Sequence, residues 1–396
     1  MNKYVIRTIK KYIPIFAILF LMVSTLFLLD VNFDRGSYFS EGIYTPKTNH
    51  FNPVAKCLMY ILPLLIVSAF APFFANSYRY SLKKADFYLQ LGKSNKKIRY
   101  INNIVLYVGL IAVYTFIFSL FTIILFCKDT SNLALNGTYE ALRFGRTYFV
   151  PDYGIFYLIY IICLPISAGT YLFSYFLITR SNNLLNSIIT FICGYIIVIF
   201  FVLATFGYAV EIENIIIGNL DLYKQPQAYL YGSFISPFYY ISSRLGQYML
   251  SEEFRVFSEL SDISIASLII NSVIFIFIST ISTMAFIKEE ESSGEYFGST
   301  KGRGKLQDVL FYIASAFMML WAGPASQLFA VNPHNFDFFF FLFFSLAFIA
   351  FYILNSLKNR NFKITKNDLK VYLPIYSIFF VSFLTVFLIA VIKNYN

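Results

Sequence analysis

The sequence predicts an all-α polytopic membrane protein, and three observations support this fold class. First, 58% of the 396 residues are hydrophobic and the mean hydropathy is +0.65, which soluble domains of this size do not reach. Second, apolar runs recur along the chain, and most are long enough to cross a hydrocarbon core roughly 30 Å thick. Third, Lys and Arg gather between alternate runs, as they do in multi-span proteins.

Nine apolar runs are predicted to span the membrane. No small-residue cleavage site follows the first run before Asp30, so we interpret this run as an uncleaved span that leaves the N-terminus in the cytoplasm. With nine spans the C-terminus lies outside. The predicted spans are 12–29, 54–75, 101–126, 153–178, 184–209, 263–287, 309–330, 338–355 and 372–392.

The charges fit this topology. Most of the 31 Lys and Arg residues fall in the segments assigned to the inside, namely 1–11, 76–101, Arg180, 288–305 and 358–370. Short cytoplasmic connections of membrane proteins carry such an excess of cations. The formal net charge of +10 is therefore explained by topology, and the sequence predicts no nucleic-acid partner.

The connection from Asn76 to Ile101, between the second and third spans, is the most distinctive part of the chain. It holds seven cations and one acid, Asp86, so it is predicted to face the cytosol. Gly92 is suited to end a helix, and Ser94 is suited to cap the helix that follows.

A short amphipathic helix is predicted inside this connection, because its apolar residues recur three and four positions apart. These residues are Leu82, Ala85 and Leu89, widened by Phe87, Tyr88 and Leu91. From periodicity alone two interpretations stay open: a helix that docks on a partner, and an interfacial helix on anionic lipid.

The longest outer segment, 211–262, contains a semi-apolar aromatic block at 228–241. This block is too short to cross the bilayer and too aromatic for an ordinary solvated loop. We predict a re-entrant or interfacial helix pair here.

Sites for chemistry are few. The four cysteines lie in or at the ends of apolar runs, and His50 and His334 are isolated, so we expect neither a metal site nor catalytic residues. Gly92-Lys93-Ser94 resembles the end of a phosphate-binding loop, but Phe87 stands where a glycine is needed. The segment 298–305 has five residues between its glycines instead of four and is followed by Leu306.

The predicted span centres carry no charged residues, whereas ion-driven carriers place ionisable groups there. If the protein moves a substrate, we expect the energy to come from another chain. A folded cytosolic helix is a place where that chain could bind.

Three motifs together resemble the permease subunits of bacterial type 2 ABC exporters, a group that includes drug, antimicrobial-peptide and polysaccharide exporters. The first is Asp86-Phe87-Tyr88 with Leu91 ahead of a basic cluster, although Gly92 replaces the usual proline. The second is Ser236-Pro237-Phe238-Tyr239 before the sixth span. The third is Glu291-Ser292-Ser293-Gly294 after it, as in Gram-positive members, although Lys288 replaces the customary arginine.

This resemblance implies a six-span exporter domain at 1–305 and accessory transmembrane helices at 306–396. It implies a coupling helix at 80–91, which sits in a cleft of a separate ATPase subunit, and an outer re-entrant gate at 228–250. The residues implied to couple to the ATPase are Leu82, Lys83, Ala85, Asp86, Phe87, Tyr88, Leu89, Leu91 and Gly92. The residues implied to form the gate are Ser236, Pro237, Phe238 and Tyr239. The resemblance also implies an inner loop motif made by Glu291 and Gly294.

The resemblance also implies partners and a location. Two permease chains, identical or related, enclose the path in a bacterial cell membrane, and ATP and magnesium bind to the partner ATPase, so that this chain binds no cofactor. An amphipathic or hydrophobic peptide, lipid or drug is the expected substrate.

Two alternatives come from other functional classes. One is a membrane-embedded enzyme of lipid or glycan metabolism that uses Glu211, Glu213, Asp221, Arg244 or Arg255, although these charges follow no recognisable spacing. The other is a non-transporting sensor subunit of a resistance complex.

Overall fold

The computed structural model describes six long segments of the chain and isolated residues after them. The long segments are 2–33, 53–80, 95–132, 153–180, 184–217 and 265–288; the others are 238, 240–242, 245, 309–318, 320–321 and single residues between 342 and 385. Every element in these described segments is helical, and none is a strand. The predicted all-α class is confirmed for this part of the chain.

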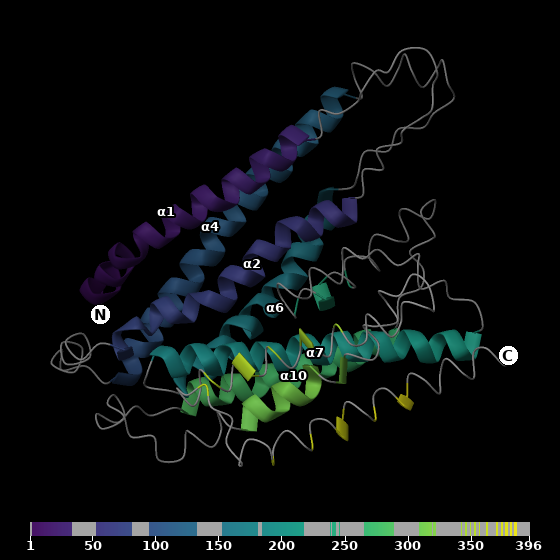
Figure 1. Ribbon diagram of the computed structural model, residues 1–396. Coiled ribbons are helices and arrows are strands. Elements are labelled where there is room, and N and C mark those ends of the chain that lie inside the picture. The colour runs from purple at the N-terminus through teal and green to yellow at the C-terminus, as the bar shows by residue number, and fades with distance from the viewer. Residues whose placement is uncertain are drawn as a thin grey trace, which may run out of the picture.

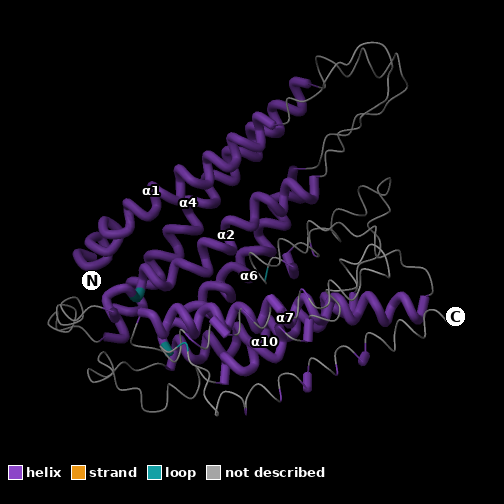
Figure 2. Tube along the Cα trace, in the orientation of Figure 1, coloured by secondary structure: helices purple, strands orange, loops and turns teal. Residues whose placement is uncertain are grey.

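The six long described segments form six α-helices and one 3₁₀ turn. They are α1 (Asn2–Phe33), α2 (Pro53–Ala75), η1 (Ser77–Tyr80), α4 (Asn95–Asn132), α6 (Tyr153–Thr179), α7 (Leu184–Ile217) and α10 (Ile265–Lys288). The tube in Figure 2 shows these helices in purple and draws no strand among the described residues.

Four segments of these helices are long and apolar enough to cross a membrane. They are Lys97–Cys127, Phe156–Thr179, Leu184–Thr205 and Ser267–Lys288. They correspond to the third to sixth predicted spans and indicate a membrane protein. Ile61–Ala75 and Val309–Met318 are shorter apolar helices, and the count of nine spans stays a prediction.

The helices form a layered bundle, with α1 against α4, α2 against both α4 and α6, and α6 against α7 and α10 (Figure 1). One end of this bundle gathers the beginnings of α1, α4 and α7 and the ends of α2, α6 and α10. Tyr4 of α1 reaches Asn102 of α4, and Arg99 of α4 reaches Phe286 of α10. We call this the Arg99 end. The described helix ends next to the predicted inner segments 1–11, 76–101, Arg180 and 288–305 therefore lie at the same end of the bundle.

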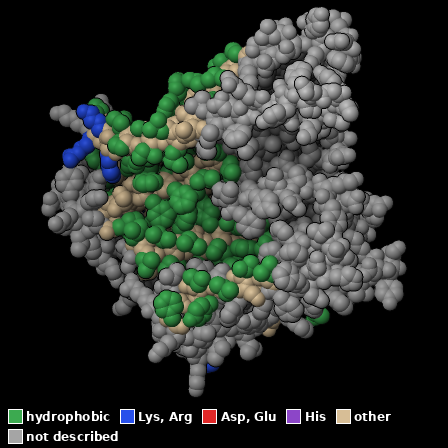
Figure 3. All heavy atoms as spheres, turned by 45° about the horizontal axis from the view of Figure 1, so that its top comes forward, with side chains coloured by type: hydrophobic (Ala, Val, Ile, Leu, Met, Phe, Trp, Pro, Cys, Tyr) green, Lys and Arg blue, Asp and Glu red, His purple; other side chains and the backbone are tan. Residues whose placement is uncertain are grey.

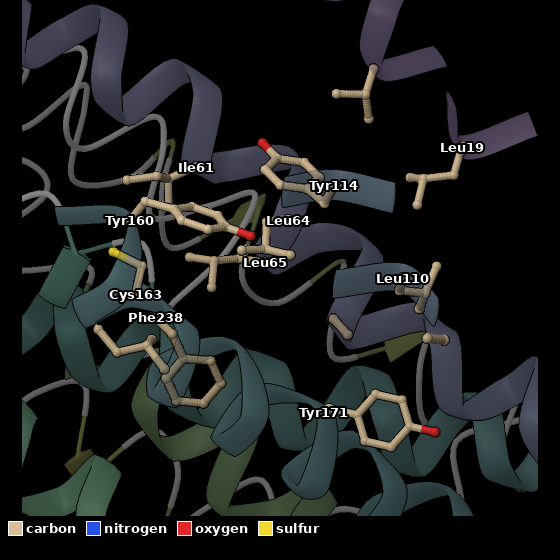
Figure 4. Close-up of a cluster of buried hydrophobic side chains, with 14 of the residues drawn as sticks. Leu19, Ile61, Leu64, Leu65, Leu110, Tyr114, Tyr160, Cys163, Tyr171 and Phe238 are labelled. Carbon is tan, nitrogen blue, oxygen red and sulfur yellow. The ribbon is translucent and has the colours of Figure 1, made fainter. Parts of the chain in front are cut away.

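Buried aromatic and aliphatic side chains fill the space between α2, α4 and α6. Figure 4 shows Leu64 and Leu65 of α2 near the rings of Tyr114 and Tyr160, which come from α4 and α6. Outside this core, hydrophobic side chains cover most of the described surface on the face in Figure 3, while Lys and Arg side chains gather at one corner. Such an apolar exterior suits contact with lipid.

Three glycines allow helices to approach closely. A Cβ at Gly109 of α4 would overlap the Phe16 ring of α1, and one at Gly194 of α7 would overlap Leu177 of α6. A Cβ at Gly169 of α6 would meet Phe275 and Ser279 of α10. Small residues have this role at helix contacts within membranes. The α1–α4, α6–α7 and α6–α10 contacts are therefore tight.

Candidate functional site

The two ends of the basic connection between α2 and α4 form the best-defined polar region of the described structure. The connection itself, 81–94, lies outside the described residues, and so do the predicted coupling residues Leu82, Lys83, Ala85, Asp86, Phe87, Tyr88, Leu89, Leu91 and Gly92. Tyr80, the first residue of the predicted coupling helix, ends η1. The helix predicted to follow Ser94 begins at Asn95.

Asn76 directly follows α2, which ends at Ala75. Its backbone N–H and its side-chain Nδ2 both donate to the carbonyl oxygen of Pro72, at 3.0 and 2.8 Å. The backbone bond is the usual helical bond to the residue four positions earlier, and the side chain adds a second donor to the same carbonyl. The chain then turns into η1, so the direction in which it leaves α2 is fixed by a buried side chain.

Asn103 of α4 connects this turn to α6. Its Oδ1 accepts a hydrogen bond of 2.8 Å from the Tyr171 hydroxyl of α6, and its Nδ2 donates to the carbonyl of Arg99 at 2.9 Å. The amides of Asn76 and Asn103 also face each other, with N–O distances of 3.4 and 3.5 Å. All three side chains are buried, where a polar group without a partner is costly. The network therefore holds α2, α4 and α6 in one arrangement.

Arg99 connects the start of α4 to the end of α10. Its Nη2 donates to the carbonyl oxygen of Phe286 at 2.9 Å, and its guanidinium carbon lies 5.7 Å from the centre of the Phe286 ring. Tyr100 supports this contact, because its ring lies 4.8 Å from that of Phe286 and its hydroxyl donates to the carbonyl of Ile287. The last carbonyls of a helix are orphaned and carry partial negative charge, so a cation is favourable there.

Tyr4 adds α1 to the same region. Its hydroxyl donates to Oδ1 of Asn102 at 3.0 Å. One turn of α4, from Arg99 to Asn103, therefore bonds to α1, α6 and α10 and faces the turn at the end of α2. A displacement of the connection before this turn would act on four other helices.

This arrangement joins helices through hydrogen bonds between polar side chains and backbone carbonyls. Its members are asparagines, tyrosines and an arginine, and the residues with described side chains contain no group of three His, Cys, Asp or Glu that could hold a metal ion. Glu211 and Glu213 belong to the end of α7, and their side chains are not described. Asp221, Arg244 and Arg255 lie outside the described residues.

Phe238 is the one predicted gate residue that the structure describes. It is buried among Phe173 of α6, Tyr195 of α7 and Phe275 of α10, at ring-centre distances of 5.8, 6.2 and 4.9 Å. Nearby, Tyr240 donates to Ser267 of α10 at 3.0 Å.

This part of the predicted re-entrant block therefore lies inside the bundle. A gating role stays a prediction, because Ser236, Pro237 and Tyr239 lie outside the described residues. The same is true of the inner loop residues Glu291 and Gly294.

Sequence reasoning did not single out Asn76, Asn103 or Tyr171, and it counted Arg99 only as one of the connection's cations. The available signal was polar side chains next to the ends of apolar runs, where membrane helices place hydrogen-bonding contacts. Their partners on other helices are 27 to 187 residues away in the sequence, and no local sequence pattern specifies such pairs.

No protein-family model, curated protein or solved structure matches the chain.

Proposed function

We propose that this chain is the permease subunit of an ATP-driven exporter. The observation that carries the proposal is the anchoring of the basic connection, whose two ends are bonded to the rest of the bundle through Asn76, Arg99 and Asn103. A connection anchored in this way can transmit a displacement caused by a partner subunit to several helices at once. A freely attached loop could not do so.

In this proposal the core has six spans and about three accessory spans follow it. ATP and magnesium bind to a separate cytosolic subunit, and this subunit binds the helix at 80–91. A second permease, identical or related, completes the path for an amphipathic or hydrophobic substrate. The chain lies in a bacterial cell membrane with its N-terminus in the cytoplasm.

Apolar helices, the distribution of charged residues and three sequence motifs support the proposal. Four described helices are long and apolar enough to cross a membrane, cations concentrate in the connection from Asn76 to Ile101, and the predicted span centres are uncharged. The motifs at 86–92, 236–239 and 291–294 resemble those of exporter permeases.

Co-expression of the chain with the product of the neighbouring gene, followed by co-purification and an assay for ATP hydrolysis, tests the proposal. Aspartate at Leu82, Phe87 and Leu89 places charge on the apolar stripe and is expected to abolish the complex. Gln90→Asp adds one such charge off the stripe, so it is the control for each single aspartate substitution and should leave the complex intact. Retention of the ATPase by the triple variant would contradict the proposal.

A further inference from the structure

A row of tyrosine hydroxyls bridges α4 and α6 along most of their shared length. Tyr107 projects from α4, and Tyr157, Tyr160 and Tyr171 project from α6. We call these four residues and their bonding partners the tyrosine seam. The bonds are Tyr171–Asn103 at 2.8 Å, Tyr107–Ser167 at 2.8 Å, Tyr160–Thr115 at 2.7 Å and Tyr157 to the carbonyl of Ser119 at 3.4 Å.

The seam spans much of a membrane. Its α4 positions run from Asn103 to Ser119, which corresponds to roughly 24 Å of helix at about 1.5 Å per residue. The rings contact one another as well, with Tyr107 and Tyr171 at 5.0 Å and Phe118 stacked on Tyr160 at 4.7 Å.

Side chains, rather than close backbone packing, make this contact. The backbones of α4 and α6 stay apart along most of their length, whereas α2 packs closely against both. The α6–α10 contact is of the opposite kind, because Gly169 leaves no room for a Cβ beside Phe275. The α4–α6 contact is therefore held by bonds that can break one at a time.

The Ser, Thr and Asn partners of the seam each keep a second bond within their own helix. Asn103 donates to the carbonyl of Arg99 at 2.9 Å, Thr115 to that of Ile111 at 2.7 Å, and Ser167 to that of Leu164 at 2.8 Å. Opening the seam beyond Asn103, with the Arg99–Phe286 bond kept, would leave the tyrosine hydroxyls to find new partners. The usual cost of orphaning both halves of a buried hydrogen bond is thereby reduced.

The outer part of the seam lies at the edge of the bundle. Tyr107, Thr115 and Ser119 are half-buried, while Val108 on the neighbouring face of α4 is 58% exposed. Parting α4 from α6 along this edge would leave the three tight helix contacts intact.

We propose that the tyrosine seam is a reversible joint between two bodies of the bundle. One body is α1 with α4, joined at Gly109 and Phe16; the other is α6 with α7 and α10, joined at Gly194 and Gly169. The Arg99–Phe286 and Tyr171–Asn103 bonds stay closed and form the hinge, and the tyrosine hydroxyls of Tyr107, Tyr157 and Tyr160 exchange partners as the bodies part beyond it. This inference does not rest on the proposed function, since the joint belongs to the chain by itself.

Spin-label distances in the full chain, purified into lipid nanodiscs without a partner or nucleotide, test the joint. Labels at Met22 of α1 and Ile161 of α6 report across the seam, and labels at Ile161 and Ile276 of α10 report within one body. All three sites are exposed. Cys57 and Cys127 are replaced by serine and the buried Cys163 and Cys193 by alanine in all samples.

Thr115→Val removes the acceptor for Tyr160 at nearly constant volume. Because hydrogen bonds between membrane helices are weak, we expect it to raise the ratio of long to short cross-seam distances by about 3- to 30-fold. Tyr160→Phe removes the hydroxyl on the other side of the same hydrogen bond. If one of these two variants fails to accumulate in cells, the other is used for the test. Tyr195→Phe is the control, since it removes a 2.6 Å bond to Ser174 inside one body.

We expect Thr115→Val or Tyr160→Phe to shift the Met22–Ile161 distances toward longer values, and Tyr195→Phe to leave them unchanged. The Ile161–Ile276 distance, within one body, should be the same in all samples. A single cross-seam distance that neither seam variant alters would overturn the proposal. Equal widening of both label pairs would also overturn it, because that is general loosening.

Discussion

The guanidinium of Arg99 donates a hydrogen bond of 2.9 Å to the carbonyl oxygen of Phe286, and this bond joins the first turns of α4 to the last turn of α10. The two residues are 187 positions apart in the sequence. The bond satisfies an orphaned carbonyl and places a buried cation where the helix dipole favours it. The end of the basic connection is thereby tied to a distant helix.

Arg99→Ala is expected to destabilise the chain. A hydrogen bond to a charged donor contributes about 1.5–3 kcal/mol, and the Phe286 carbonyl would lose its partner. Titration of the purified chain with SDS, followed by circular dichroism, measures the change. Arg99→Lys is the control that keeps the charge and should lose less stability; an alanine variant as stable as the wild type would show that the contact contributes nothing.

Asn103→Leu is expected to cost about 1–3 kcal/mol, because it removes the acceptor of the buried Tyr171 hydroxyl. Adding Tyr171→Phe removes the hydroxyl, which would otherwise keep only the longer contact to the backbone carbonyl of residue 103 at 3.3 Å, and should restore part of the loss. The same unfolding assay on both single variants and the double variant gives a coupling energy. Strictly additive effects would mean that the two side chains do not depend on each other.

Gly169→Val is expected to force α6 away from α10, since its Cβ would meet the Phe275 ring and the Ser279 hydroxyl. Overpacking of this kind costs about 1–3 kcal/mol. Phe275→Leu in the same chain removes the ring and should recover stability. Gly154→Val, at the exposed start of α6, is the matched control. Equal losses at Gly154 and Gly169 would point to a helix-propensity effect rather than packing.

Phe238→Ala is expected to cost about 3–5 kcal/mol, as large-to-small changes of buried aromatic residues do. The ring contacts α6, α7 and α10 together, so its loss should loosen all three. Phe238→Leu keeps most of the volume and should cost less. Hydrogen exchange followed by mass spectrometry locates the loosening; protection that is unchanged in α6, α7 and α10 would argue against this packing.

The long helices follow directly from the sequence, whereas the polar contacts between them do not. The predicted fourth span, 153–178, corresponds to Tyr153–Thr179, and the predicted sixth, 263–287, to Ile265–Lys288, because an apolar run in a membrane has few alternatives to helix. The third span was predicted from Ile101, but α4 begins at Asn95 and continues to Asn132. Hydropathy identifies only the apolar part of a helix, whereas backbone hydrogen bonding extends the helix into the polar residues on either side.

Arg99 shows why the site was harder to predict than the spans. A cation beside a run of lysines is normally solvated, and nothing in the local sequence indicates that the end of α10 lies against it. Burial of Arg99 depends on carbonyls that reach it only after the bundle has assembled. The same reasoning applies to Asn76 and Asn103, whose contact depends on how α2 meets α4.

Photo-crosslinking from position 87 in intact cells tests whether an ATP-hydrolysing subunit docks on the basic connection. With benzoylphenylalanine in place of Phe87, at the centre of this connection, we expect a covalent adduct with that subunit. The same group at Ile276, on the exposed face of α10, should give no such adduct. Absence of the adduct from position 87, while labelling of that position shows that it faces the exterior, would contradict the claim.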